Sequence, residues 1–194
     1  MGFGEAPAAF EGPTQKARVW TEGWVADQMF CPSCGARTLS RHRANNPASD
    51  FYCKSCSEEY ELKSQRNRFG KRVTDGALNS MLGRMSAGKT PNLLLLNYSR
   101  EELRVANLIV VPKQFFVPSI IEPRRPLGPN ARRAGWQGCN ILLSEVPEAG
   151  KVWLVRDGAL LAREGILADW RRTMFLREGT QDARGWLIEV IKCV

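Results

Sequence analysis

Two pairs of cysteines constrain this chain more than any other feature. Each pair has the spacing Cys-x-x-Cys, at Cys31 and Cys34 and again at Cys53 and Cys56, with 18 residues between the pairs. This spacing is typical of a site in which four thiolates bind one zinc ion. Because four thiolates leave no open coordination position, we expect a structural zinc that cross-links residues 31–56.

The other two cysteines, Cys139 and Cys193, lie outside this pattern and indicate reduced thiols. The first residues lack the basic and apolar regions of a signal peptide, and no stretch reaches the roughly 18 apolar residues that span a bilayer. We therefore expect a soluble, cytoplasmic protein.

Hydrophobic periodicity predicts an α/β fold. Apolar residues recur at helical spacing over 14–29 and 71–87, and Gly88 can end the second helix. Continuous apolar runs over 92–98 and 106–111 favour central strands covered on both faces. We further expect a hairpin over 51–63, a loop over 112–138, strands near 139–143 and 151–155, a helix near 164–175 and a final strand over 186–193. The pattern predicts one domain over residues 14–194, a mixed sheet flanked by helices with a zinc-ribbon insertion, after a disordered start at 1–13.

Acidic and basic residues surround the second cysteine pair. Asp50 precedes the expected hairpin, and Glu61 and Lys63 are two apart on its return strand, so they point to the same face. Phosphodiester hydrolysis needs a hard divalent cation held by carboxylates, and a neighbouring ammonium can orient the attacking water. Asp50, Glu61 and the backbone carbonyl of Leu62 could hold Mg²⁺ beside Lys63, which is the PD-(D/E)xK arrangement.

A different interpretation fits the same residues. Glu61 and Lys63 could form only a surface ion pair in a zinc-ribbon protein that binds nucleic acid without cutting it. The single histidine, His42, argues against a nuclease with a histidine general base and against a metal centre of several histidines. On the spacing of these residues alone, the surface ion pair is the simpler explanation, and a magnesium-dependent nuclease is the alternative.

Positive charge is concentrated in two segments. The chain has 28 Lys and Arg against 20 Asp and Glu, a net charge of +8. Seven basic residues stand against one acidic residue over 63–89, and five against one over 113–133. Such clusters favour contacts with DNA phosphates. The candidate DNA-binding residues here are Arg66, Arg68, Lys71, Arg72, Arg132 and Arg133.

The chain resembles the DpnI-type family of methyl-directed restriction endonucleases, also called Dam-replacing, in six strings. They are CPSCG (31–35), DFYCKSCSEEYELKS (50–64), VPKQF (111–115), ARRAGWQGCNI (131–141), RDG (156–158) and RGWLIE (184–189). The resemblance implies a type II PD-(D/E)xK nuclease that cleaves double-stranded DNA at GATC containing N6-methyladenine, with Mg²⁺ and a four-cysteine zinc. It implies catalytic roles for Asp50, Glu61 and Lys63.

The resemblance also places Trp136 near the methylated adenine. An indole face could receive the N6-methyl group in the major groove. Burial of one methyl group yields about 0.8 kcal/mol, or about fourfold in affinity, which is too little for sharp discrimination. We therefore expect methylation to act on the cleavage rate as well as on binding. Members of the family carry a C-terminal winged-helix domain, and we expect no such domain after the string at 184–189 in this sequence. No obligatory protein partner is evident. A PD-(D/E)xK nuclease indifferent to methylation is a further alternative.

Overall fold

The computed structural model describes residues 2–3, 12–43, 46 and 49–193, which fall into two compact units. Unit 1 comprises residues 1–68, 91–112 and 151–172, and unit 2 comprises residues 69–90, 113–150 and 173–194. Each unit has its own β-sheet and its own buried side chains.

The elements of unit 1 are mostly strands. They are α1 (Pro13–Gln28), β1 (Ser40–Arg41), β2 (Phe51–Tyr52), β3 (Glu59–Gln65), β5 (Asn92–Ser99), β6 (Arg104–Val111), β9 (Val152–Arg156), β10 (Ala159–Leu160) and α3 (Arg163–Thr173), whose last residue belongs to unit 2. Unit 2 contains β4 (Arg72–Ala77), α2 (Leu78–Ser86), β7 (Ile121–Pro123), β8 (Gly138–Leu142), α4 (Gln181–Lys192) and the five short 3₁₀ helices.

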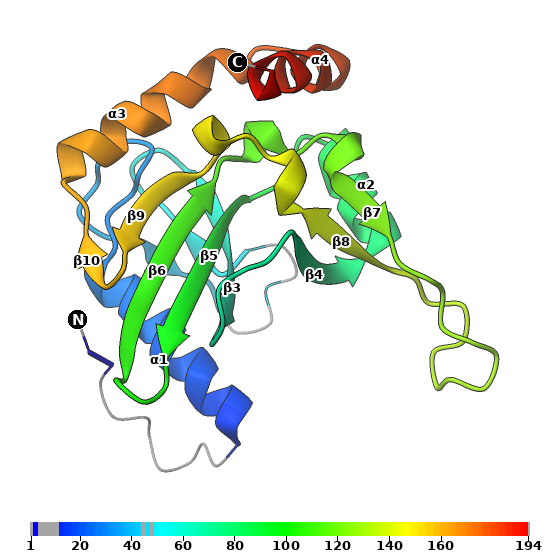
Figure 1. The fold of residues 1–194 in the computed structure, drawn as a ribbon, viewed down its shortest axis with the longest axis horizontal. Coiled ribbons are helices and arrows are strands. Elements are labelled where there is room, and N and C mark those ends of the chain that lie inside the picture. Colours follow the sequence, from blue (N-terminus) through cyan, green and yellow to red (C-terminus); the bar gives the residue numbers. More distant parts are fainter. Residues whose placement is uncertain (1, 4–11, 44–45, 47–48, 194) are drawn as a thin grey trace. The chain divides into compact units, whose positions relative to one another are not determined.

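The sheet of unit 1 has seven strands in the order β1-β2-β3-β5-β6-β9-β10 (Figure 1). Among the described strands, β3 and β5 are the only parallel neighbours, and Glu61 lies opposite Leu93 in their register. All side chains of residues 92–97 in β5 are buried, as expected for a strand covered on both faces. The predictions of a mixed α/β sheet and of central strands over 92–98 and 106–111 are confirmed.

Helix α1 packs against β3. Pro13 opens the helix, where its missing N–H removes no helical hydrogen bond. The buried residues Ala17, Thr21, Trp24 and Val25 follow one another at intervals of four, three and one residues and so share one face. Thr21 Oγ1 donates to the Ala17 carbonyl at 2.9 Å and lies 3.1 Å from Ser64 Oγ on β3. The predicted helix over 14–29 is confirmed within one residue.

The three-stranded antiparallel sheet of unit 2 has the order β4-β8-β7. The helix predicted over 71–87 is wrong in its first half, because residues 72–77 form β4. Val73 and Asp75 are buried between exposed neighbours, which is the period of a strand, and Val73 pairs with Ile141 of β8. The second half is the helix α2, and Gly88 with φ +65° follows its end as predicted.

The strand predicted over 186–193 is also wrong, because residues 186–192 belong to α4 and Cys193 caps its end. Thr180 caps the helix by accepting a hydrogen bond from Ala183 N at 3.3 Å. Gly185, which the prediction placed before a strand, lies inside the helix. A short apolar run does not distinguish strand from helix by periodicity, and the cap was the better signal.

The remaining predictions concern connections and ends. The strands predicted near 139–143 and 151–155 and the helix near 164–175 are confirmed as β8, β9 and α3. The predicted loop over 112–138 contains two 3₁₀ helices and β7. The prediction of disorder over residues 1–13 falls mostly outside the described residues, which include only 2–3 and 12–13 of this segment. Within it, the ring of Phe3 stacks on Trp20, with ring centroids 5.8 Å apart.

Candidate active site and metal centre

The four cysteines of the two pairs converge on one point in unit 1. The Sγ atoms of Cys31, Cys34, Cys53 and Cys56 all lie within 4.8 Å of one another. The Cys31–Cys56 and Cys34–Cys53 sulfur atoms are each 3.6 Å apart. A tetrahedral zinc with Zn–S bonds of about 2.3 Å needs sulfur atoms roughly 3.8 Å apart. The four-cysteine group can therefore hold a metal ion such as zinc.

Each cysteine pair lies on a tight backbone turn. Gly35 N donates to the Cys31 carbonyl at 2.8 Å, and Ser57 N donates to the Cys53 carbonyl at 2.9 Å. Gly35 and Ser57 follow the second cysteine of each pair and have φ of +78° and +59°. A guanidinium N–H of Arg163 on α3 also donates to the Gly35 carbonyl. The repeated turn gives both pairs the same local geometry.

Burial shapes the acidity of these thiols. It raises the pKa of Cys31 and raises that of Cys56 to about 11. Burial also acts to raise the pKa of Cys53, but hydrogen bonds from the backbone N–H groups of Cys56 and Ser55 and from the Cys34 and Cys56 side chains together outweigh it and lower that pKa to about 7. Tyr60 Oη lies 3.2 Å from Cys31 Sγ. A bound divalent cation would supply the positive charge that keeps the four cysteines in their thiolate form.

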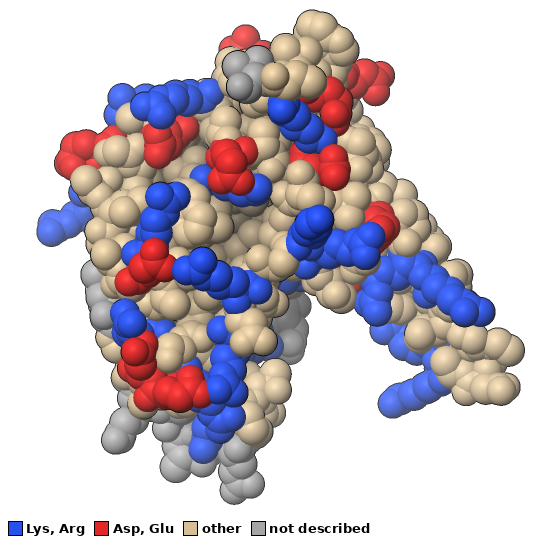
Figure 2. Space-filling view, in the orientation of Figure 1, with Lys and Arg blue, Asp and Glu red and all other residues tan. Residues whose placement is uncertain are grey.

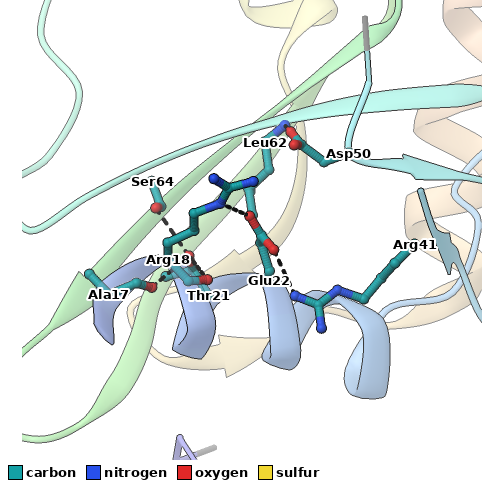
Figure 3. A network of polar contacts seen from close by, with 8 residues as sticks. All are labelled: Ala17, Arg18, Thr21, Glu22, Arg41, Asp50, Leu62 and Ser64. Atoms are coloured by element: carbon teal, nitrogen blue, oxygen red, sulfur yellow. Dashed lines mark hydrogen bonds and ion pairs between the residues drawn. The ribbon is translucent and has the colours of Figure 1, made fainter. Parts of the chain in front are cut away.

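The hairpin of β2 and β3 positions Asp50. Phe51 lies opposite Tyr60 in the hairpin, and Asp50 N donates to the Tyr60 carbonyl at 2.9 Å. Asp50 Oδ2 accepts a hydrogen bond from Leu62 N at 2.7 Å (Figure 3). The carboxylate of Asp50 is thus fixed beside the residue that separates Glu61 from Lys63.

Glu61 and Lys63 contact each other on β3. Lys63 Nζ lies 2.7 Å from Glu61 Oε1, and the two side chains are 25% and 20% exposed. Their spacing of two residues places them on one face of the strand, as the sequence predicts. The ion pair neutralises part of the Glu61 charge while leaving both groups accessible to solvent.

The edge of β3 is open next to Asp50. Strand β2 pairs only with Glu59 and Tyr60, so from Leu62 onward no strand among the described residues covers this edge. The N–H and carbonyl of one residue point to the same edge of an extended strand, so the Leu62 carbonyl faces the same edge as Asp50. Two carboxylates and a carbonyl are oxygen donors that suit Mg²⁺, and the donor set fits that ion.

The other acidic residues of the hairpin make different contacts. Glu58 is buried and accepts a hydrogen bond from Asn92 Nδ2 at 2.8 Å. Glu59 accepts one from Ser49 Oγ at 3.0 Å and lies 3.7 Å from His42 Nε2. These contacts leave Glu61 as the carboxylate paired with the lysine. His42 lies within the segment bounded by the cysteines, with a half-buried side chain.

Three charged residues near Asp50 were not predicted from the sequence. Arg18 Nε donates to Glu22 Oε1 at 2.5 Å, and Arg41 Nη2 donates to Glu22 Oε2 at 2.7 Å (Figure 3). Arg18 has a raised pKa, mainly through its hydrogen bond with Glu22 and with a smaller contribution from the charge of Asp50. The spacing of four between Arg18 and Glu22 was a usable helical signal, whereas nothing in the sequence points to Arg41.

Two of the predicted DNA-binding residues lie in unit 1. Arg66 forms an ion pair with Glu101, and Arg68 forms one with Asp157 at 2.8 Å. Both arginine side chains are exposed, at 57% and 78%. Exposed pairs contribute little to stability, so these guanidiniums remain able to exchange a carboxylate for a phosphate.

The other predicted DNA-binding residues lie in unit 2. Lys71 is exposed, and Arg72 on β4 pairs with Glu122 at 3.0 Å. Arg132 and Arg133 are exposed on the loop between β7 and β8, residues 124–137, which we call the β7–β8 loop. Figure 2 shows basic side chains gathered on this loop, which extends beyond the ends of its two strands.

Trp136 closes the β7–β8 loop. Its carbonyl accepts a hydrogen bond from Leu127 N at 2.9 Å, and its own N–H donates to the Arg133 carbonyl at 3.0 Å. The guanidinium of Arg133 lies 5.1 Å from the centre of the indole ring. A Cβ atom at Gly138 would lie 2.9 Å from the far edge of this ring, so the ring packs closely on the Gly138 backbone. The side chain is half-buried.

Among the described residues, no helix combines the length and the apolar character that a membrane span requires. The chain was also compared with models of protein families. The model of the DpnI Dam-replacing family matches residues 6–179, which include both cysteine pairs, Asp50, Glu61, Lys63 and the β7–β8 loop. Members of this family are restriction endonucleases, whose substrate is DNA. Since the match covers most of its length, this chain belongs to the DpnI Dam-replacing family.

Proposed function

We propose that this protein is a magnesium-dependent endonuclease of the PD-(D/E)xK type that cuts double-stranded DNA at GATC containing N6-methyladenine. One observation carries the catalytic part of this proposal. The β2–β3 hairpin holds Asp50 Oδ2 at 2.7 Å from the backbone N of Leu62, at the open edge of β3. Leu62 is the residue between Glu61 and Lys63. The Asp50 carboxylate and the Leu62 carbonyl lie at this edge, and the Glu61 carboxylate and the Lys63 ammonium lie on one face of the same part of the strand.

Each residue has a distinct role in this proposal. Asp50, Glu61 and the Leu62 carbonyl would hold Mg²⁺, which when bound supplies a Lewis acid for the phosphate and lowers the pKa of a coordinated water. Lys63 Nζ lies 2.7 Å from Glu61 and stabilises negative charge that develops on the phosphate. The four cysteines would hold together the two turns that flank Asp50 in the sequence. Since Cys53 is only three residues from Asp50, a metal bound there would also help to fix the position of Asp50.

Specificity for the methylated site rests on the β7–β8 loop in this proposal. Arg132 and Arg133 would contact the phosphates or guanine, and the indole of Trp136 would contact the N6-methyl group. Two buried methyl groups are worth roughly fifteenfold in affinity. Stronger discrimination requires that methylation also favours the cleavage-competent position of the DNA, which would appear in the cleavage rate.

The test is digestion of one plasmid prepared with and without adenine methylation at GATC, in Mg²⁺, by the wild type and by Asp50→Asn. The asparagine retains an oxygen that can accept the hydrogen bond from Leu62 N but lacks the charge needed for Mg²⁺. We expect cleavage of the methylated plasmid by the wild type and no detectable cleavage by the variant. Asp27→Asn, at an exposed aspartate near the end of α1 in the same unit, is the matched control and should cut normally.

Two results would contradict the proposal in different ways. Equal cleavage of both plasmids would indicate a PD-(D/E)xK nuclease without methyl specificity. Absence of cleavage by the wild type, with DNA binding retained, would favour a zinc-ribbon protein that binds nucleic acid and uses Glu61 and Lys63 only as an ion pair.

A further inference from the structure

A basic cavity of about 260 Å³ lies in unit 1. It is formed by the first turns of α1, the end of β3 and the end of β5. Four basic side chains line it, together with two aromatic ones: Lys16, Arg18, Arg66, Arg100, Trp20 and Tyr98. Among the described residues, no aspartate or glutamate lines it. The cavity therefore has the electrostatic character of an anion-binding site.

The start of α1 adds to this positive character. The first turn of the helix contains no acidic residue, and Gly12 provides no side-chain cap for its N–H groups. The partial positive charge at the start of a helix of this length favours a nearby anion. Pro13 and Thr14 of this turn line the cavity beside Lys16.

Two residues connect the cavity to the candidate active site. Arg18 lines the cavity and belongs to the network with Glu22 and Arg41 shown in Figure 3. Ser64 also lines the cavity and follows Lys63 on β3. Ser64 and Lys63 point to opposite faces of the strand. Arg18 lies close enough to Asp50 for their charges to interact, so the backbone of a DNA strand bound at Asp50 can reach the cavity past Arg18.

The aromatic residues favour a phosphate over a base as the occupant. Trp20 already stacks on Phe3, with 11° between the ring planes, and Tyr98 meets Phe3 edge-on at 6.1 Å. Rings engaged in packing are poorly placed to stack on a splayed base. The basic groups remain available, since Lys16 and Arg100 form no ion pair with a described carboxylate and Arg18 and Arg66 have exposed side chains.

We propose that this cavity binds the sugar-phosphate backbone of the DNA strand beside the cleaved bond, with Arg18 and Arg100 contacting phosphate oxygens. This inference rests on the proposed function for the identity of the ligand. Glu22 is a positioning residue here, because its two carboxylate oxygens hold Arg18 and Arg41 and so fix the direction of their guanidiniums. Phosphate contacts of this kind are independent of base sequence.

The test measures binding of the full chain to two duplexes, one with methylated GATC and one with a scrambled sequence, over a series of salt concentrations. Ca²⁺ replaces Mg²⁺ so that the DNA stays intact. Each phosphate contact contributes about 0.9 to the slope of log K against log salt. We expect the slope to fall by about 0.9 in Arg18→Ala and by about 1.8 in Arg18→Ala/Arg100→Ala, equally on both duplexes. Arg18→Lys should retain most of the slope.

Arg171→Ala is the matched control, since Arg171 is an exposed arginine of the same unit that does not line the cavity. An unchanged slope in the double variant, equal to that of Arg171→Ala, would overturn the inference. Circular dichroism should give wild-type spectra for all variants, because an exposed pair such as Arg18–Glu22 adds little stability. Cleavage by the wild type in Mg²⁺ is measured separately, so a wild type that binds through these arginines but never cuts would refute only the proposed function.

Discussion

The hairpin around Asp50 and the β7–β8 loop both carry predicted functional residues, but they are held in different ways. In the hairpin, Asp50 is fixed by its own backbone and by its carboxylate, and the adjoining turns converge on four cysteines. The β7–β8 loop is held by backbone hydrogen bonds such as Leu127 N to the Trp136 carbonyl. Its arginines are exposed, apart from the contact of Arg133 with the indole of Trp136.

This difference matches two different demands. A group that binds a catalytic metal must stay within a fraction of an ångström of its productive position. A long arginine that contacts phosphate gains its energy mainly from charge and tolerates several positions. We therefore expect changes in the hairpin to reduce the rate of cleavage, and changes in the β7–β8 loop to reduce affinity and discrimination.

The largest effect should follow loss of the metal at the four cysteines. Cys53→Ser removes one thiolate, and structural zinc sites supply on the order of 10 kcal/mol or more of folding free energy. We expect the variant to contain no zinc, to unfold at a lower temperature and to lose cleavage. Metal content, thermal unfolding and plasmid cleavage measure these three results.

Cys193→Ser is the control for that experiment, because Cys193 is exposed and lies outside the cluster. It should keep its zinc and its activity. If zinc-free Cys53→Ser cut DNA at the wild-type rate, the cysteine cluster would have no part in positioning Asp50.

The next largest effect should come from Lys63. Lys63→Ala removes the ammonium that lies 2.7 Å from Glu61, while Asp50 keeps its hydrogen bond to Leu62 N. We expect single-turnover cleavage to slow by roughly 10²- to 10³-fold, the usual cost of removing one charge-stabilising group. Binding in Ca²⁺ should change little. Lys54→Ala, at an exposed lysine on the nearby cysteine turn, should match the wild type; a similar loss in both variants would contradict a specific role for Lys63.

The hairpin was also the part of the molecule that the sequence predicted best, since its signals are local. The cysteine spacing predicted a four-thiol cluster, and the spacing of Glu61 and Lys63 predicted a shared face; both features are present in the structure. Each depends on residues that lie close together in the sequence, where the period of a strand or turn fixes the geometry.

Features that depend on distant residues were not predictable in this way. The network of Arg18, Glu22 and Arg41 needs α1 to pack against β3, which no local pattern specifies. One of the two wrong elements has the same cause, because Val73 is drawn into β4 by pairing with Ile141 almost seventy residues away. The other, α4, had a local signal in the Thr180 cap, which its short apolar run concealed.

A smaller effect is expected from the arginines of the β7–β8 loop. Arg132→Ala and Arg133→Ala should each lower the salt slope of DNA binding by about 0.9 if each contacts one phosphate. The cleavage rate at saturating protein should stay close to that of the wild type. Binding isotherms at several salt concentrations and single-turnover cleavage separate the two quantities. If Arg132→Ala or Arg133→Ala kept the wild-type affinity but cleaved slowly, the loop would affect the cleavage rate as the hairpin does, and the expected difference between the two regions would be wrong.

The smallest effect should appear in the preference for methylated DNA. Trp136→Ala removes the proposed methyl contact, and we expect the binding preference to fall by about fourfold for each methyl group lost from contact.

Gly138→Ala offers a milder test, because the new Cβ would lie 2.9 Å from the indole and push the ring aside without removing it. Gly83→Ala, at a glycine in α2 with open space around it, is the control. If Gly138→Ala lowers the preference and Gly83→Ala does not, the position of the indole matters as well as its presence. The β7–β8 loop would then need to hold the indole of Trp136 in a fixed position, whereas its arginines tolerate several positions.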